Sequence, residues 1–168
     1  NCGEQIMIKN KIQWAFCLMA VLALVAAPMA NADDRDDVEA VINQYIDSEG
    51  FDLAEQTSLM ASDRTYIFGG MRYSNNDKSM ALQTAGNAVI TTANPDAQRI
   101  ATIEDLELRV NGNAAVASFY RTINDTNSVE NVRAGQGALI TIYQTATMVL
   151  FKMDDGWKIV HTHLSPTK

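Results

Sequence analysis

The chain has 168 residues, of which 47% are hydrophobic and 20% are charged, and its formal net charge is −7. This length and composition fit one globular domain and exclude a disordered chain. The acidic balance argues against nucleic acid or an anionic membrane surface as a partner. Two cysteines, Cys2 and Cys17, provide no disulfide framework.

The first 32 residues have the pattern of an export signal. Residues 1–6 precede Met7 and are treated as upstream sequence. After Met7 come two lysines, an apolar run over 15–27 and the small-residue sequence Ala30-Asn31-Ala32. This order predicts a secretory signal peptide over 7–32, cleaved before Asp33. A membrane-spanning helix is the alternative, but it needs about 20 apolar residues, and this run is shorter.

Cleavage at this site would leave a domain over 33–168 that contains no cysteine. It would remove two lysines and one glutamate from the 13 basic and 20 acidic residues, which leaves a formal charge of −8. A bacterial signal of this type predicts a periplasmic or secreted protein. The stability of the domain must then come from its core, without disulfides.

Three helices are predicted in the first half of this domain. Apolar residues one helical turn apart predict a helix over 34–50, and Gly50 ends it. A second, shorter helix follows over 52–60, with Asp52 and Glu55 resembling a capping box. After a strand at 65–68, Asp77 is the expected cap of a third helix over 78–92. The residues expected on the buried side of the third helix are Met80, Ala81, Thr84, Ala88 and Val89.

Strands dominate the second half. They are predicted over 100–110, 114–123, 139–153 and 157–165, with Asn111-Gly112 as a hairpin turn and 124–137 as a long loop. The strand over 139–153 is apolar or threonine on both alternating faces, so both faces should be covered, one of them by a second copy of the chain. This order of elements predicts an α+β domain with helices on one side of a mostly antiparallel sheet.

The segment 155–165, Asp-Gly-Trp-Lys-Ile-Val-His-Thr-His-Leu-Ser, resembles the ending of SnoaL-like domains in the NTF2-like superfamily. This group includes DUF4440-type domains, the association domain of calcium/calmodulin-dependent kinase II and ketosteroid isomerase-like proteins. The order of elements resembles the superfamily across 33–165. The resemblance implies a cystatin/NTF2-like cone, in which a curved, mostly antiparallel sheet wraps around N-terminal helices and leaves a pocket at the open end. It also implies homodimers or larger rings.

The resemblance does not carry over the catalytic residues of two enzyme branches. Steroid isomerases have a catalytic aspartate shortly after a segment similar to 61–65, and the matching position here is Phe68. A phenylalanine side chain cannot abstract a proton. The limonene epoxide hydrolase branch needs two aspartates around an arginine, and the strand over 114–123 holds Arg121 but no carboxylate.

The kinase association domain has a pocket that resembles an anion site lined by arginines. Arg121 matches one of these arginines, whereas Met148 replaces the second and Leu164 stands at the third. With one cation kept and two exchanged for apolar groups, the pocket is expected to prefer a larger apolar ligand with one anionic or polar end.

Two tyrosines and two histidines complete the candidate residues. Tyr45 and Tyr66 could each place a hydroxyl donor in the pocket, or they could be core residues. His161 and His163 share one face of the last strand. They could bind a metal with a third ligand, transfer protons or bind ligand, or serve structurally at a subunit contact. Leu164 has the opposite parity, so it and the histidines cannot face the same pocket unless a β-bulge intervenes.

The sequence therefore predicts an exported, homodimeric SnoaL-type domain that binds a small, mainly apolar molecule without a metal or cofactor. An isomerase, lyase or hydrolase in the same pocket, using tyrosine, histidine and arginine, is one alternative. A homo-oligomeric assembly module is another. Nucleic acid is not expected as a partner, nor is a membrane after signal cleavage.

Overall fold

The computed structural model describes residues 32–50 and 53–167. The predicted signal peptide, residues 7–32, falls outside this part except for its last residue. Within it, the elements in chain order are α2 (Ala32–Asp47), α3 (Ala54–Ser58), β1 (Met60–Phe68), β2 (Met71–Tyr73), α4 (Asn76–Ala93), β3 (Arg99–Asn111), β4 (Ala114–Thr126), α5 (Val129–Arg133), β5 (Leu139–Met153) and β6 (Gly156–Pro166).

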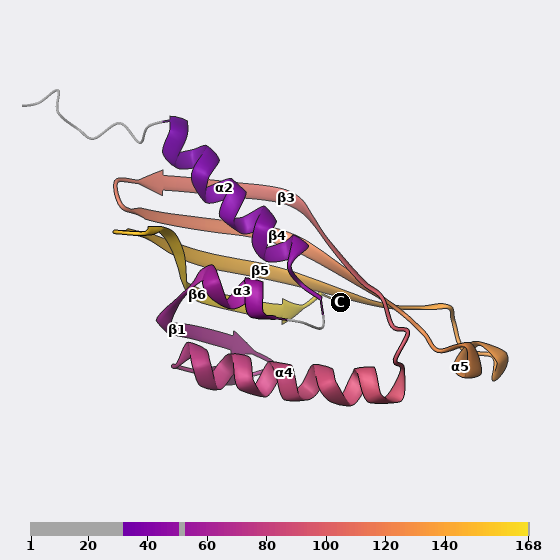
Figure 1. The fold of residues 1–168 in the computed structure, drawn as a ribbon. Helices are drawn as coiled ribbons and strands as arrows, with labels where there is room; N and C mark the ends of the chain where they lie inside the picture. Colours follow the sequence, from indigo (N-terminus) through magenta and orange to yellow (C-terminus); the bar gives the residue numbers. More distant parts are fainter. Residues whose placement is uncertain (1–31, 51–52, 168) are drawn as a thin grey trace, which may run out of the picture.

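The strands form one six-stranded sheet in the order β2-β1-β6-β5-β4-β3. Every neighbouring pair is antiparallel except β1 and β6, which are parallel. Helix α2 packs against β3 and β6, and α4 packs against β1 and β2 (Figure 1). The α+β class and the mostly antiparallel sheet that the sequence predicts are confirmed.

Helix α2 forms as its hydrophobic spacing predicts. Val38, Ile42, Tyr45 and Ile46 are all buried, so the apolar stripe faces the sheet. Asp33 and Asp34 lie in the first turn, where the helix dipole favours negative charge. The N-cap of α3 is Leu53, which makes no side-chain hydrogen bond, whereas the capping box predicted for this helix pairs Glu55 with Asp52. Asp52 lies outside the described residues.

Helix α4 buries a different side from the one predicted. Its buried residues are Asn76, Ser79, Met80 and Asn87. Of the expected apolar set only Met80 is buried; Ala81, Thr84, Ala88 and Val89 are all exposed. Asn75, not Asp77, caps the helix, and its side chain accepts a 2.9 Å hydrogen bond from the Lys78 backbone N–H. The reason is that α4 turns a polar stripe toward a cavity, which a search for hydrophobic periodicity does not detect.

Irregularities in β1 and β3 adjust which side chains face the helices. β1 begins at Met60, before the predicted start, and its pairing with β6 shifts register between Met60 and Thr65. In β3 a register shift falls between Glu104 and Glu107, and Asp105 has a φ of 53°. This bulge lets Ile103 and Leu108, which have opposite parity, both pack against the core.

Two hairpins turn at glycines, the first of them at the predicted Asn111-Gly112. Gly112, with a φ of 57°, joins β3 to β4, and Gly156, with a φ of 111°, joins β5 to β6. The predicted loop between β4 and β5 holds the short helix α5, whose N-cap Ser128 accepts a hydrogen bond from the Asn131 N–H. The β4–β5 hairpin extends past α4 toward α5 (Figure 1).

The core lies between the helices and one face of the sheet, which we call the inner face. Its β4, β5 and β6 members are Ala115, Ala117, Phe119, Ala146, Met148, Leu150, Trp157, Ile159 and Leu164. The opposite, outer face carries Val116, Tyr120 and Tyr143, which are exposed in the single chain. Across the part of the chain that is described, no helix is long and apolar enough to cross a membrane.

Candidate functional site

A cavity of about 320 Å³ opens between α2, α4 and the inner face of the sheet. Every strand contributes to its lining. The lining residues are Tyr45, Glu49, Tyr66, Phe68, Tyr73, Ser79, Leu82, Gln83, Asn87, Arg99, Arg121, Ile123, Ile142, Gln144 and Leu164. We call this cavity the cone pocket.

One wall of the cone pocket is a buried ion pair. Glu49 follows the end of α2 and contacts the Arg121 guanidinium on β4 through Oε1 and Nη2. The two side chains are only 9% and 4% exposed. Glu49 Oε2, Arg121 Nε and Nη1, and Oε1 of the neighbouring Gln144 have no hydrogen-bond partner among the described residues. This wall therefore holds both donors and acceptors that a ligand could satisfy.

A second ion pair supports this wall from β3. Arg99 donates from Nε to Asp125 Oδ1 and from Nη2 to Asp125 Oδ2, both at 2.8 Å. The two residues are direct partners in the β3–β4 register, so the strand pairing places them face to face. Bidentate geometry of this kind fixes the orientation of the guanidinium. The hydrogen bond to Asp125 raises the Arg99 pKa, so the arginine stays charged.

The pKa of Glu49 reflects competition between burial and its cationic neighbours. Burial raises the pKa of this carboxyl, whereas Arg121 and then Arg99 lower it. The net direction is upward. Desolvation thus outweighs the attraction of the guanidinium, which is common for buried ion pairs. The Glu49 carboxyl therefore binds a proton at a higher pH than an exposed glutamate does.

Two tyrosine hydroxyls come from different elements. Tyr45 on α2 and Tyr66 on β1 are both buried. Burial raises the pKa of each hydroxyl, so both remain protonated and able to donate a hydrogen bond. For Tyr45, the positive charge of Arg64 acts in the opposite direction. The Tyr66 ring stacks on Phe68 and on Tyr73, with ring centroids 6.4 Å and 6.0 Å apart.

Arg64 lies behind the tyrosines and is fully buried, with 0% exposure. Its guanidinium carbon is 4.8 Å from the centroid of the Tyr66 ring. Its Nη1 donates to Asn76 Oδ1 at 3.3 Å and contacts the sulfurs of Met60 and Met80. Nε and Nη2 have no hydrogen-bond partner among the described residues.

The mouth of the cone pocket is apolar. Phe68, Leu82 and Ile142 line it and are exposed, although each is large and hydrophobic. Leu164 lies beside Phe68 in the parallel register of β1 and β6. The pocket thus has an apolar rim and a polar wall, which is the usual composition of a small-molecule site.

The structure brings five of the eight candidate residues together. Tyr45, Tyr66, Phe68, Arg121 and Leu164 all line the cone pocket. Each comes from α2, β1, β4 or β6, so the site depends on tertiary packing of distant segments.

The other three candidates lie elsewhere. Met148 is fully buried in the core beneath α2 rather than lining the cavity. His161 and His163 are on the outer face of β6, opposite Val149 and Thr147 of β5. The register irregularity of β6 lies before His161, so it does not bring either histidine to the side of Leu164. Leu164 therefore faces the pocket, and the two histidines, which alternate with it along β6, face away from the pocket.

Several lining residues were not predicted. Glu49, Arg99 and Gln144 supply much of the polar wall, and Ser79, Gln83 and Asn87 come from α4. The spacing of the α4 residues by four is a polar helical stripe, and searching for it would have found this side. Glu49 offers no such signal, because it falls just after a helix in an ordinary acidic position.

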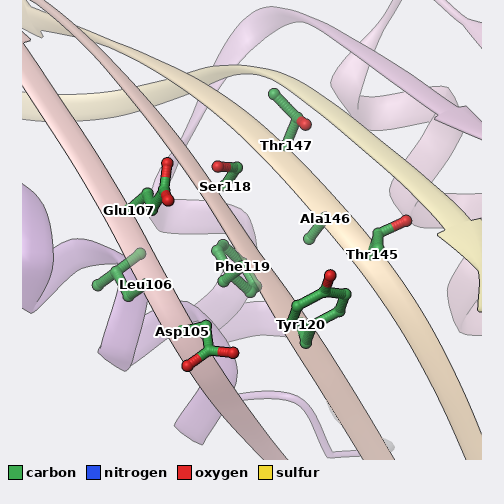
Figure 2. Close-up of a pocket in the computed structure, with 9 residues that line it drawn as sticks. All are labelled: Asp105, Leu106, Glu107, Ser118, Phe119, Tyr120, Thr145, Ala146 and Thr147. Carbon is green, nitrogen blue, oxygen red and sulfur yellow. The ribbon is translucent and has the colours of Figure 1, made fainter.

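A second, larger hollow of about 580 Å³ lies on the outer face. Figure 2 shows its lining residues on three neighbouring strands, β3, β4 and β5. Asp105, Glu107, Ser118, Tyr120 and Thr147 of this lining are exposed. The hollow lies at the register shift of β3 between Glu104 and Glu107, where Asp105 has a φ of 53°. In the part of the chain that is described, no three histidine, cysteine, aspartate or glutamate side chains converge as metal ligands do.

The structure resembles solved NTF2-like proteins. A putative dehydratase of the NTF2-like family from Streptomyces avermitilis has a TM-score of 0.65 and 17% identity, with 80% of this chain and 97% of that chain covered. An NTF2-like superfamily protein from Salmonella enterica serovar Typhimurium has a TM-score of 0.63 and 23% identity, with 83% and 94% covered. These likenesses establish the fold alone.

An association domain is also among the similar structures. That of the Caenorhabditis elegans kinase CaMKII has a TM-score of 0.61 and 16% identity, with 81% of this chain and 98% of that chain covered. No curated protein sequence matches the chain. The sequence profile of the SnoaL-like domain matches residues 38–168. Because this match covers most of the chain, the chain belongs to the SnoaL-like domain family, and its fold is that of the similar NTF2-like structures.

Proposed function

We propose that the cone pocket binds a small molecule with an apolar body and one polar end. The observation that carries this proposal is the division of the pocket into an apolar rim, at Phe68, Leu82 and Ile142, and a polar wall, at Glu49 and Arg121. Its volume of about 320 Å³ lies within the range of small-molecule sites. The polar end would contact the wall, and the apolar body would fill the rim.

The test is native mass spectrometry of the protein purified without detergent, followed by a thermal-shift screen of amphiphilic small molecules. We expect a co-purified mass, or stabilisation by amphiphiles, that is lost in Arg121→Met and kept in Arg109→Met. Arg109 is a matched control because it is an exposed arginine on β3, away from the pocket. The proposal fails if only small dicarboxylates stabilise the protein, or if a crystal structure shows the cone filled by side chains.

A reaction in the same pocket is the second candidate, and Glu49 is the observation that favours it. The position that matches the isomerase aspartate is Phe68, but Glu49 brings a buried carboxylate to the pocket that the Tyr45 side chain also lines. A carboxylate and a hydroxyl donor can serve proton-transfer chemistry. Hydrogen–deuterium exchange of ketone probes in D₂O tests this. Exchange catalysed by the wild type and lost in Glu49→Gln supports it, whereas equal exchange in both rejects it.

We propose that the outer face mediates self-association, and two observations support this proposal. Val116, Tyr120, Tyr143 and Phe151 are exposed hydrophobic side chains on the outer faces of β4 and β5. Two of the similar solved structures are association or hub domains of CaMKII. Analytical ultracentrifugation should show a dimer or larger ring that Tyr143→Glu converts to monomer. Leu82→Glu, at an exposed position on α4, is the control and should keep the oligomer.

We further propose that the protein acts after export, in the periplasm or outside the cell. The support is the signal pattern over 7–32, which ends where α2 begins. Expression of the full chain in a bacterial host, followed by fractionation and mass spectrometry, tests it. We expect an exported protein whose first residue is Asp33. An uncleaved protein in the cytoplasm would contradict the proposal.

A further inference from the structure

Arg64 is the most unusual charged group among the described residues. It is fully buried, and none of the ion pairs in the described part of the chain includes it. A buried cation that lacks a carboxylate partner carries a large desolvation cost. Two of its three guanidinium nitrogens also lack a hydrogen-bond partner there. An arginine keeps its proton, so it cannot escape this cost by becoming neutral.

The other charges around the cone pocket cancel in pairs. Arg121 is paired with Glu49, and Arg99 with Asp125. Arg64 is left over, so the interior formed by residues 32–50 and 53–167 carries one positive charge without a carboxylate partner. If Glu49 takes up a proton, as the upward direction of its pKa favours, the positive balance increases. In both protonation states, the field inside the cone favours a negative charge.

Arg64 acts on the pocket through Tyr45. Arg64 itself does not line the cavity, whereas Tyr45 and Tyr66 do. Its guanidinium lies over the Tyr66 ring, and its positive charge acts on the Tyr45 hydroxyl. A cation next to a hydroxyl attracts the oxygen and repels the proton, so the O–H bond turns away from Arg64. The hydroxyl of Tyr45 is thereby held as a donor toward the cavity, and it requires an acceptor from the ligand.

We propose that the cone pocket selects an organic anion with an apolar body, for which Arg64 is the positioning residue. The anionic end, a carboxylate in the simplest case, accepts a hydrogen bond from Tyr45 and compensates the buried charge of Arg64. This inference rests on the proposed ligand-binding function and adds to it the charge of the ligand. It also gives the unpaired buried cation a purpose beyond stability, since the fold itself would be served better by an apolar side chain at this position.

Matched pairs of probes separate charge from apolar burial. Octanoate and 1-octanol, together with 2-naphthoate and 2-naphthol, are titrated by calorimetry near neutral pH. We expect the wild type to bind each carboxylate about tenfold or more tightly than the matching alcohol. Arg64→Met should abolish this preference by weakening the carboxylates, while the affinity for the alcohols stays within about threefold. Arg64→Lys should keep a preference, because it keeps the charge.

A purely structural role for Arg64 would give a different result. In that case Arg64→Met would lower the unfolding temperature and weaken acids and alcohols alike. We expect instead an unchanged or higher unfolding temperature, because a methionine would join Met60 and Met80 in an apolar site. Arg109→Met is the control for net charge, and it should leave the preference intact.

The outcomes distinguish this inference from the proposed function. If no amphiphile binds, the proposed function fails. If acids and alcohols bind equally to the wild type, the pocket binds ligands but the inference fails. If Arg64→Met does not fold, Arg64→Lys and Tyr45→Phe decide: the preference must persist in the first and decline in the second, and any other pattern overturns the inference.

Discussion

Glu49 and Arg121 form a buried ion pair that joins the segment after α2 to the middle of β4. This contact closes one side of the cone pocket and ties the first described helix to the sheet. Burying either charged side chain without the other would cost unfolding free energy. Its energetic contribution is therefore best measured by changing both residues as well as each one.

Single substitutions in this pair should be more harmful than the double substitution. Arg121→Met leaves the Glu49 carboxyl buried without its cation, and such a change costs about 3–5 kcal/mol of unfolding free energy. Glu49→Leu with Arg121→Met removes both charges and should cost less than Arg121→Met alone. Urea denaturation of the two single variants and the double variant measures this. Additive costs would show that the two residues do not interact. Lys152→Ala, which breaks an exposed pair with Asp34, should have little effect.

The stability of the protein should fall on acidification through His161. The pKa of His161 is lowered from 6.5, mainly by burial and next by His163. Below pH 6.5 the unfolded chain therefore binds a proton at this position before the folded chain does. Because the unfolded state binds more protons, the free energy of unfolding decreases as the pH falls from 6.5 through the lowered pKa.

Urea denaturation between about pH 8 and about pH 5 detects this proton linkage. His161→Asn should reduce the slope of stability against pH. His163→Asn should reduce it less, because it removes only one of the influences on His161. An unchanged slope in His161→Asn would assign the pH dependence to other groups.

The two possible caps of α4 can be compared directly. Asn75→Ala removes the side chain that accepts from the Lys78 N–H and should cost about 1 kcal/mol of unfolding free energy. Asp77→Ala removes only a charge in the first turn and should cost less. Chemical denaturation of both variants measures the difference. A larger cost for Asp77→Ala would show that Asp77 is the cap in solution.

Met148 should behave as a core residue. It is fully buried beneath α2, so Met148→Ala should cost about 2–5 kcal/mol of stability through lost packing and a residual cavity. The affinity of the folded protein for pocket ligands should be unchanged, since Met148 does not line the cone pocket. Denaturation and ligand titration on the same variant test both statements. A loss of affinity without a loss of stability would place Met148 in the site.

The fold was accessible from the sequence because its signals are local and repetitive. The stripe of α2 and the Asn111-Gly112 turn are patterns of apolar spacing and turn chemistry, and the structure contains both. The side of α4 was not accessible by the same means. Its inward residues Ser79 and Asn87 are polar because they face a cavity. A prediction based on the spacing of hydrophobic residues therefore assigned the exposed residues of α4 to the buried side.

The candidate site was accessible only in part, and the reasons are geometric. Phe68 and Leu164 could be identified because they match functional positions of related domains, and Tyr45 because it is a tyrosine on the apolar stripe of α2. Glu49 could not, because its role depends on meeting Arg121 across the fold. Arg64 lies outside the strand predicted over 65–68, and only its complete burial without a carboxylate partner among the described residues distinguishes it.

The parallel pairing of β1 with β6 has a consequence for how the domain folds. β6 is inserted between β1 and β5, although most of the described chain separates it from β1 in sequence. Closing so long a loop is slow, and it must precede the contact of Phe68 with its neighbour Leu164. During synthesis, the helices and β1 emerge well before the strand that completes the pocket. The cone pocket is therefore complete only after β6 has been synthesised and has paired with β1 and β5. A nascent chain without β6 lacks the complete ligand site.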